Sequence, residues 1–328
     1  MSVAADVPRE AGWIGRVIRA GFTFIVGTLL CLTPVTALLV LGWLMRRMRM
    51  VALRCAGLAG ERPGWILGAR DRRGLARWLG GLAANTREGV MAAVALALAT
   101  APFSVIWLLS WWAGWENSFS KGYEQAFVGP SLGLFGVAVF CVTMVWLPMA
   151  LAHQAVENRA FALFEFRAVQ SAVRHSGWGY LCLALATVIA SLPLFGARSL
   201  VVFASDIIPG FDQMTPDQVA GLAGSISLAL AAYVFLALLV LRSWAARLYA
   251  SAVARALEGP DASLWQASPL AEGRTGGRRS WKLTHWARIA VLAVLWFGLA
   301  AQVFVGQFMN HDWHLWMTHP LVLLPWAG

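Results

Sequence analysis

The chain has 328 residues, of which 59% are hydrophobic and only 13% are charged, and its formal net charge is +10 at pH 7. Soluble globular domains are about half apolar and roughly a quarter charged, so this composition excludes an ordinary soluble domain. The four cysteines have no paired spacing, so they indicate neither a disulfide framework nor a metal cluster.

Six apolar stretches are long enough to cross a bilayer, because a helical span needs roughly 20 mostly apolar residues. They are residues 21–45, 89–114, 131–152, 178–205, 219–241 and 289–309. The pattern predicts an all-α polytopic membrane protein, a single membrane domain over residues 1–328 with interfacial amphipathic helices. Five of these stretches are predicted spans, whereas the first either re-enters the membrane as a hairpin or forms a sixth span.

Basic residues mark one predicted side of the membrane. Ten Lys or Arg lie in segment 46–88, three in segment 153–177 and eight in segment 242–288, whereas the opposite side holds Lys121 and Arg198. By the positive-inside rule the three basic segments are cytoplasmic. The excess of arginine over lysine is typical of a high-GC bacterium. We therefore expect the bacterial inner membrane, with the C-terminus in the periplasm.

The first apolar stretch, residues 21–45, has basic residues on both flanks. Those before it are Arg9, Arg16 and Arg19, and those after it are Arg46, Arg47 and Arg49. Thr33-Pro34 lies at its midpoint, where proline removes a backbone donor and permits a break. A hairpin would keep both flanks and the N-terminus in the cytoplasm, although protein must then cover the broken backbone. An ordinary span kinked at Pro34 would place the N-terminus outside, and this alternative stays open.

Segment 157–174, ENRAFALFEFRAVQSAVR, has the pattern of an interfacial helix, with aromatic residues on one stripe and arginines on another. Such a surface is suited to anionic lipid headgroups or to a partner subunit, and a simple topology anchor between two spans is the alternative. The residues predicted to form it are Arg159, Phe161, Phe164, Arg167 and Arg174, together with Arg46, Arg47 and Arg49.

The chain also carries a hint of duplication, since LALAT occurs at 96–100 and again at 183–187. Internal repeats over residues 70–152 and 157–239 are a possible interpretation, and parallel repeats of this kind occur in transporters. Residues 261–280 are polar and contain Gly and Ser, which predicts a flexible cytoplasmic loop.

Small residues at four-residue spacing mark two candidate faces for close helix packing. They are Ala93, Ala97 and Ala101 in the second apolar stretch, and Gly221, Ser225 and Ala229 in the fifth.

Three stretches of the sequence resemble a family of bacterial and archaeal multi-pass membrane proteins defined as a domain of unknown function. They are LLCLTPVTALLVLGWLMRRMR, the RPGW turn, and ALAHQAVENRAFALFEFRAVQSAVRHSGWGYL. The similarity covers about residues 20–240. Its third pattern, Phe-x-Phe…Gly-x-Tyr-Leu, falls on Phe164, Phe166, Gly179, Tyr180 and Leu181. Gly64 stands where the family has an acidic residue. The resemblance implies a multi-pass architecture and transfers no reaction and no site.

The sequence contains no phosphate-binding loop, hydrolase elbow or zinc-protease motif, so we predict no catalytic residue. The apolar stretches hold no Asp, Glu or Lys, which counts against an energised transporter. Residues 310–320, NHDWHLWMTHP, place His311, His314 and His319 close together. Zinc, copper or a tetrapyrrole would accept such ligands, whereas an interfacial tail among headgroups is the alternative. No other cofactor is predicted.

These features predict a non-enzymatic accessory, assembly or scaffold protein of the inner membrane. Its partners would be the bilayer, anionic lipid headgroups and other membrane-protein subunits, because topology accounts for the basic charge without nucleic acid. A small-solute transporter or channel built on the two repeats is one alternative. A metal- or pigment-binding membrane subunit that uses the C-terminal histidines is another.

Overall fold

The computed structural model describes the chain outside residues 1–12, 60–73, 114–126, 274–284, 311–318 and 328. The described residues form helices and contain no strand, and six of these helices are long and apolar enough to cross a membrane. These six are Trp13–Leu30, Gly74–Trp111, Val128–Glu157, Trp178–Leu200, Pro216–Leu257 and His285–Val303. The prediction of an all-α polytopic membrane protein is therefore confirmed.

The longer helices are α1 (Trp13–Leu30), α2 (Pro34–Cys55), α3 (Gly74–Trp111), α5 (Val128–Glu157), α6 (Phe166–His175), α7 (Trp178–Val202), α9 (Pro216–Leu257) and α10 (His285–Asn310). Short helical turns are η3 (Ala162–Phe164), α8 (Ala204–Ile207), η4 (Phe211–Gln213) and η5 (Ala262–Leu264).

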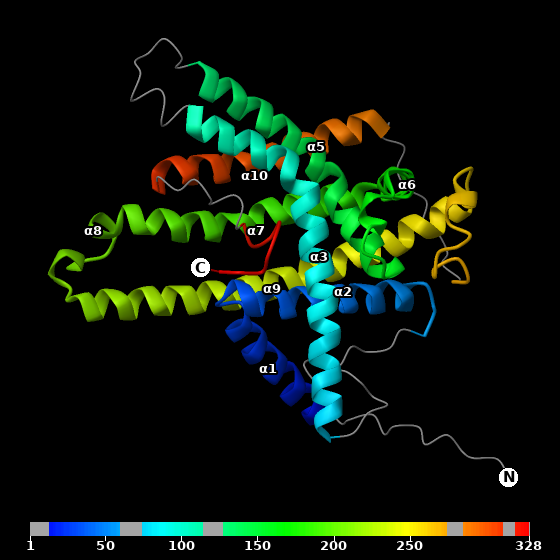
Figure 1. Ribbon diagram of the computed structural model, residues 1–328, viewed down its shortest axis with the longest axis horizontal. Helices are drawn as coiled ribbons and strands as arrows, with labels where there is room; N and C mark the ends of the chain where they lie inside the picture. The colour runs from blue at the N-terminus through cyan, green and yellow to red at the C-terminus, as the bar shows by residue number, and fades with distance from the viewer. Residues whose placement is uncertain (1–12, 60–73, 114–126, 274–284, 311–318, 328) are drawn as a thin grey trace.

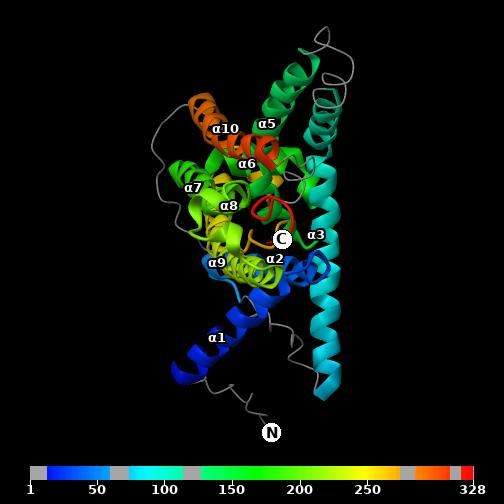
Figure 2. The same cartoon turned by 90° about the vertical axis from the view of Figure 1, so that its left-hand side faces the viewer.

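Helices α2, α7, α9 and α10 run roughly side by side, and α3 lies across them (Figures 1 and 2). Successive helices α5, α7, α9 and α10 alternate in direction along this bundle. Helices α2, α5 and α9 finish at one end of the bundle, and α7 and α10 begin there. We call this end the arginine-rich end. The opposite end carries the turn from α7 to α9.

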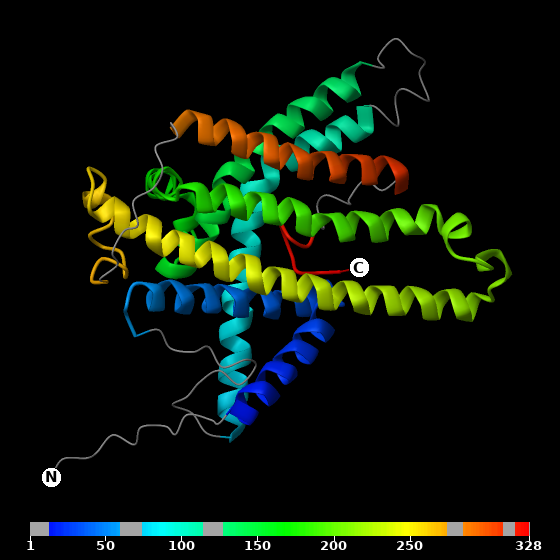
Figure 3. The same ribbon diagram turned by 180° about the vertical axis from the view of Figure 1, so that it is seen from behind.

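The first apolar stretch is broken at Thr33-Pro34, which is the hairpin alternative of the two that the sequence leaves open. Thr33 accepts a hydrogen bond from the Thr36 backbone N–H at 3.3 Å, and Pro34 occupies the first turn of α2, where its missing N–H costs nothing. Thr36 Oγ1 also donates to the Leu30 carbonyl at 2.8 Å, which satisfies the end of α1. Helices α1 and α2 form a V that opens toward the arginine-rich end (Figures 1 and 3). The chain thus reverses along the bundle at residues 31–33.

Helices α2 and α3 cross at a point that only glycine permits. A Cβ atom on Gly42 would collide with the Asn85 backbone oxygen, and one on Gly89 would collide with the Leu38 carbonyl oxygen. Two helix backbones therefore meet directly at this crossing. Arg46 Nη1 donates to Asn85 Oδ1 at 2.9 Å beside it, so a polar contact fixes the same crossing.

Helix α5 lies at the centre of the main core, where it contacts α2, α3, α6, α9 and α10. A second cluster joins α1, α2 and α9 around Phe235, on which the Trp43 ring stacks with centroids 5.9 Å apart. The C-terminal segment enters this second cluster through Leu321, and the Ala327 N–H donates to the Cys31 carbonyl at 3.1 Å. The chain end is therefore packed against the apex of the V.

The outer faces of the long helices are apolar. Helix α7 exposes Leu185, Ile189 and Leu192, and α9 exposes Leu236 and Val240. Exposed apolar faces of this extent are unfavourable in water and are expected against lipid.

The candidate small-residue faces are only partly used in contacts within the described chain, where Ala93 packs against the main core. Gly221, Ser225 and Ala229 are exposed, as is Ala97, while Ala93 and Ala101 are only half-buried. The buried face of α3 is formed by Ala92, Ala95, Leu96, Ala99 and Phe103.

Segment 157–174 is not the single helix that its pattern predicts. Helix α5 ends at Glu157, Asn158 adopts a left-handed conformation with φ 55°, and α6 begins only at Phe166 after the short turn η3. The two repeats also differ in build, because α3 is continuous whereas α6 and α7 are separate helices.

The expected flexible loop 261–280 is folded over its first half. Residues 261–273 contain η5 and several turns, and Trp265 is only 1% exposed. Ser268 Oγ donates to Glu157 Oε1 at 2.9 Å, which ties this segment to the end of α5. The remainder of the predicted loop, 274–280, lies outside the described residues.

Candidate functional site

A buried polar network lies at the arginine-rich end. His153, near the end of α5, is 2% exposed, and its Nδ1 lies 2.7 Å from the Tyr249 hydroxyl on α9. Its Nε2 lies 2.8 Å from Glu165 Oε2, just before α6. Arg159 Nη2 pairs with the other Glu165 oxygen at 2.6 Å. Four side chains from three parts of the chain thus form one continuous chain of polar contacts.

Trp265 encloses this network from the segment after α9. Its ring stands edge-on to His153, with centroids 5.7 Å apart and planes at 88°, and edge-on to Tyr249 at 6.0 Å. Aromatic pairs favour such edge-to-face geometry. Water is therefore kept from the His153–Tyr249 contact by a side chain from the segment that composition alone predicts to be flexible.

The local chain path explains how Glu165 reaches His153, twelve residues earlier in the sequence. Asn158 takes the left-handed conformation that commonly ends helices, so the chain turns back after α5. The turn η3 then carries Glu165 back to the His153 side chain. A continuous helix over 157–174 would carry Glu165 away from His153, which is a physical reason for the break.

Electrostatics favours the ionised form of Glu165 in this network. Burial opposes the ionisation of Glu165, but the hydrogen bonds and charges of His153 and Arg159 outweigh it and hold the pKa of Glu165 below its ordinary value. An ionised carboxylate only accepts hydrogen bonds, so His153 Nε2 carries the proton. His153 Nδ1 lies 2.7 Å from the Tyr249 hydroxyl, within hydrogen-bond distance. Every polar group in the network has a partner.

A second polar cluster fastens α6 to the segment after α9. Ser171 Oγ donates to Asp261 Oδ2 at 2.7 Å and accepts from Trp265 Nε1 at 3.3 Å. Arg174 Nη1 lies 3.7 Å from the same Asp261 oxygen. Trp265 therefore links both clusters, because its ring covers His153 while its N–H holds Ser171.

Five of the residues predicted to meet lipid or a partner lie at the surface of this end, among them Arg159 and Arg174, whose side chains also form the ion pairs described above. Phe161 is 69% exposed, Arg167 is exposed, and Phe164 is half-buried with its ring centroid 6.5 Å from that of Phe161. Phe166, which the sequence analysis did not place in the surface, is 62% exposed and stacks on Trp146 at 5.1 Å. Aromatic and arginine side chains therefore gather here.

Two predicted surface arginines on α2 contact other helices. Arg46 bonds Asn85 on α3, as described above. Arg47 Nε donates to Ser243 Oγ on α9 at 3.3 Å, and its guanidinium carbon lies 5.6 Å from the Trp43 ring centroid. Both are half-buried, so the structure places them between helices.

Arg49 joins α2 to the end of α5 and to α3 through Asn158. With its amide nitrogen turned toward Glu88, Asn158 donates to the two Glu88 carboxylate oxygens at 2.8 and 2.9 Å. Its amide oxygen accepts from Arg49 Nη1 at 3.1 Å. The orientation follows from the bonding partners, as is usual for an amide. The residue that ends α5 thus also anchors two other helices.

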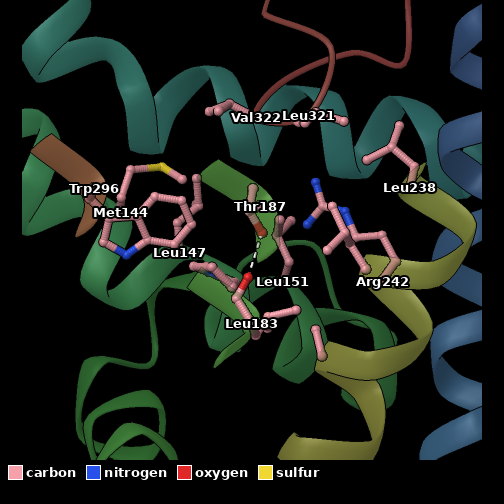
Figure 4. A pocket seen from close by; sticks show the side chains of 13 residues that line it. Met144, Leu147, Leu151, Leu183, Thr187, Leu238, Arg242, Trp296, Leu321 and Val322 are labelled. Atoms are coloured by element: carbon pink, nitrogen blue, oxygen red, sulfur yellow. Dashed lines mark hydrogen bonds between the residues drawn. The ribbon is translucent and has the colours of Figure 1, made fainter. Parts of the chain in front are cut away.

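A cavity of about 30 Å³ lies deeper in the bundle, between α5, α7, α9, α10 and the C-terminal segment. Figure 4 shows the Arg242 guanidinium directed into it, between Thr187 and the C-terminal segment at Leu321. Arg242 is only 9% exposed. The Thr187 hydroxyl already donates to the Leu183 carbonyl at 2.8 Å. Most of the remaining lining is apolar, so a permanent charge faces a largely apolar space.

Of the three predicted metal-ligating histidines, His311 and His314 lie outside the described residues. His319 is buried and lies beside Arg198, Ser191 and Gln302. Burial, together with the charge of Arg198, lowers the pKa of His319 to about 3, so the imidazole is neutral at physiological pH. In the part of the chain that the structure describes, no group of three or more His, Cys, Asp or Glu side chains could hold a metal ion.

Comparison of the chain with family models, curated proteins and solved structures finds no match in any of the three. A function can therefore be argued only from the architecture and its polar contacts. The resemblance to a family of multi-pass membrane proteins stays a prediction.

Proposed function

We propose that this integral membrane protein is a non-enzymatic scaffold or assembly subunit of the bacterial inner membrane. Its arginine-rich end would face the cytoplasm and bind anionic lipid headgroups through Phe161, Phe166 and Arg167. The observation that carries the proposal is the gathering of these exposed side chains on a segment that the His153 network holds in one conformation.

The chemistry of the surface is suited to the membrane interface. Aromatic side chains are enriched at the headgroup level, where part of the ring meets lipid tails and part meets water. Each Lys or Arg near an anionic leaflet contributes about 1 kcal/mol of attraction. Phe161 and Phe166 supply the aromatic contact, and the exposed Arg167 supplies the charge.

A fixed surface is better suited to binding than a mobile one, because less conformational entropy is lost when it binds. The polar groups of the His153 network have partners, and Trp265 covers them. These contacts favour a rigid surface at the arginine-rich end.

The test uses the full-length protein in a neutral detergent and native mass spectrometry with added phosphatidylglycerol or phosphatidylcholine. We expect the wild type to retain phosphatidylglycerol preferentially. The triple change Phe161→Ser, Phe166→Ser and Arg167→Gln should reduce this retention several-fold. The control is Phe127→Ser, which alters an exposed phenylalanine at the start of α5, at the opposite end of that helix.

Equal retention of both lipids by the wild type would contradict the proposal. So would a triple variant that keeps the wild-type preference. Reduced retention in the Phe127→Ser control would show that the effect is not specific to the arginine-rich end.

A further inference from the structure

Arg242 is a buried cation that its own chain leaves unpaired. It lies on α9 and is more than nine-tenths buried, and among the described residues it makes no hydrogen bond or ion pair. A guanidinium carries five N–H donors and a charge that is not lost in proteins. Burying such a group is costly unless an opposite charge or acceptors accompany it. Its burial therefore requires an occupant for the space that it faces.

The space in front of Arg242 is a defined cavity. Four helices and the C-terminal segment line it, and the guanidinium points into it (Figure 4). Its lining includes no carboxylate. The Thr187 hydroxyl proton is already used by Leu183, so this hydroxyl adds a weak acceptor and no charge. Nothing on the wall can neutralise Arg242.

The size of the cavity limits its occupant. Its volume, about 30 Å³, is close to the roughly 30 Å³ that one water molecule occupies in the liquid. A spherical monovalent anion is of similar size, whereas a tetrahedral phosphate or sulfate group is much larger. Water fits as well but brings no charge. The apolar lining around a permanent cation therefore favours a small anion over water.

We infer that this cavity binds one small monovalent anion of halide size, held by the Arg242 guanidinium. Leu321 and Val322 of the C-terminal segment close one side of the site. The inference is independent of the proposed lipid surface, because none of the residues of that surface lines the cavity.

The test is equilibrium binding of radioactive chloride to the full-length protein in a neutral detergent at constant ionic strength, with gluconate as the balancing anion. We expect saturable binding of one chloride per chain, displaced by bromide and not by phosphate or gluconate. Arg242→Gln should weaken binding at least tenfold. Arg247→Gln is the matched control, because Arg247 is exposed on the same helix, and it should bind as the wild type does.

Arg242→Gln is checked for folding by its thermal unfolding curve. If it does not fold, Ala245→Leu provides the second variant, since Ala245 lines the cavity and a larger side chain would fill it while Arg242 remains. Loss of chloride binding in the folded variant supports the inference. It is overturned if the wild type shows no saturable binding, if phosphate displaces chloride, or if the folded variant used still binds chloride normally.

Discussion

His153 is the residue on which the arginine-rich end depends most, because it is the only link between Glu165 and Tyr249 among the described contacts. Its two ring nitrogens hold side chains from different helices. Apolar contacts around His153 are not directional, so they alone would allow several arrangements of the helices. The two hydrogen bonds specify a single arrangement.

We predict that His153→Ala lowers the free energy of unfolding by about 2–4 kcal/mol, since it leaves the buried Tyr249 hydroxyl unpaired and removes a partner of Glu165. Chemical unfolding in detergent, followed by tryptophan fluorescence, measures this change. Gln170→Ala, an exposed change on α6, serves as the control and should have little effect. A loss no larger than that of the control would mean that the network does not hold this end together.

Glu165 gives this end a dependence on pH. Its pKa in the folded protein lies below the ordinary value of 4.5, so folding favours its charged form. The stabilisation is complete above the unfolded pKa and is lost as the pH falls through the folded pKa. We predict that wild-type stability declines below about pH 4.5 more steeply than that of Glu165→Gln. If the free energy of unfolding of the two proteins changes equally with pH over this range, the lowered pKa of Glu165 is contradicted.

At the scale of elements, the structure depends on one helix crossing and on one connection between consecutive helices. The crossing of α2 and α3 needs glycine, because the two backbones touch at Gly42 and Gly89. The join between α5 and α6 needs polar side chains, because Asn158 ends α5 and Glu165 returns to it. Neither feature belongs to the apolar pattern of the spans.

We predict that Gly89→Ala lowers the free energy of unfolding by about 1–3 kcal/mol, because its new methyl group collides with the Leu38 carbonyl and separates the helices. Gly224→Ala is the matched control, since it lies within α9 and no atom lies within 4 Å of its added Cβ. Alanine favours helices over glycine by roughly 0.5–1 kcal/mol, so the control should be as stable as the wild type or more so. Equal stability of the two variants would rule out a close crossing at Gly89.

Sequence reasoning located the elements well, because each long apolar stretch must be satisfied as a helix within lipid. The break at Thr33-Pro34 was predictable for the same kind of local reason, since proline and a capping threonine act on their own backbone. The helix break within 157–174 was not, because it depends on His153 meeting Glu165 and on Arg49 meeting Asn158.

The candidate site was largely out of reach of the sequence. His153 and Tyr249 are 96 residues apart, and each stands in an ordinary apolar or helical context. Arginines near span ends predict a membrane surface, but Arg46 and Arg47 are partly used between helices because their long side chains reach α3 and α9. Arg242 is the first basic residue after an apolar stretch, and only the fold shows that it turns into a cavity.

At the scale of the whole molecule, the alternating helices and the V of α1 and α2 give the chain two distinct ends. In the proposed topology the arginine-rich end faces the cytoplasm, because arginine is retained on that side of bacterial membranes. The V directs the start of α1 toward the same end, so this topology would place both basic flanks of the first apolar stretch in the cytoplasm.

The most direct test is labelling of single cysteines in intact spheroplasts with a membrane-impermeant maleimide, in a protein whose Cys31, Cys55, Cys141 and Cys182 have been replaced. We expect Gln213→Cys, exposed in the turn between α7 and α9, to be labelled without permeabilisation. Gln170→Cys and Trp13→Cys, exposed on α6 and at the start of α1, should react only after the membrane is opened. Labelling of Gln170→Cys in intact spheroplasts would contradict the cytoplasmic assignment, and labelling of Trp13→Cys alone would contradict the reversal at residues 31–33.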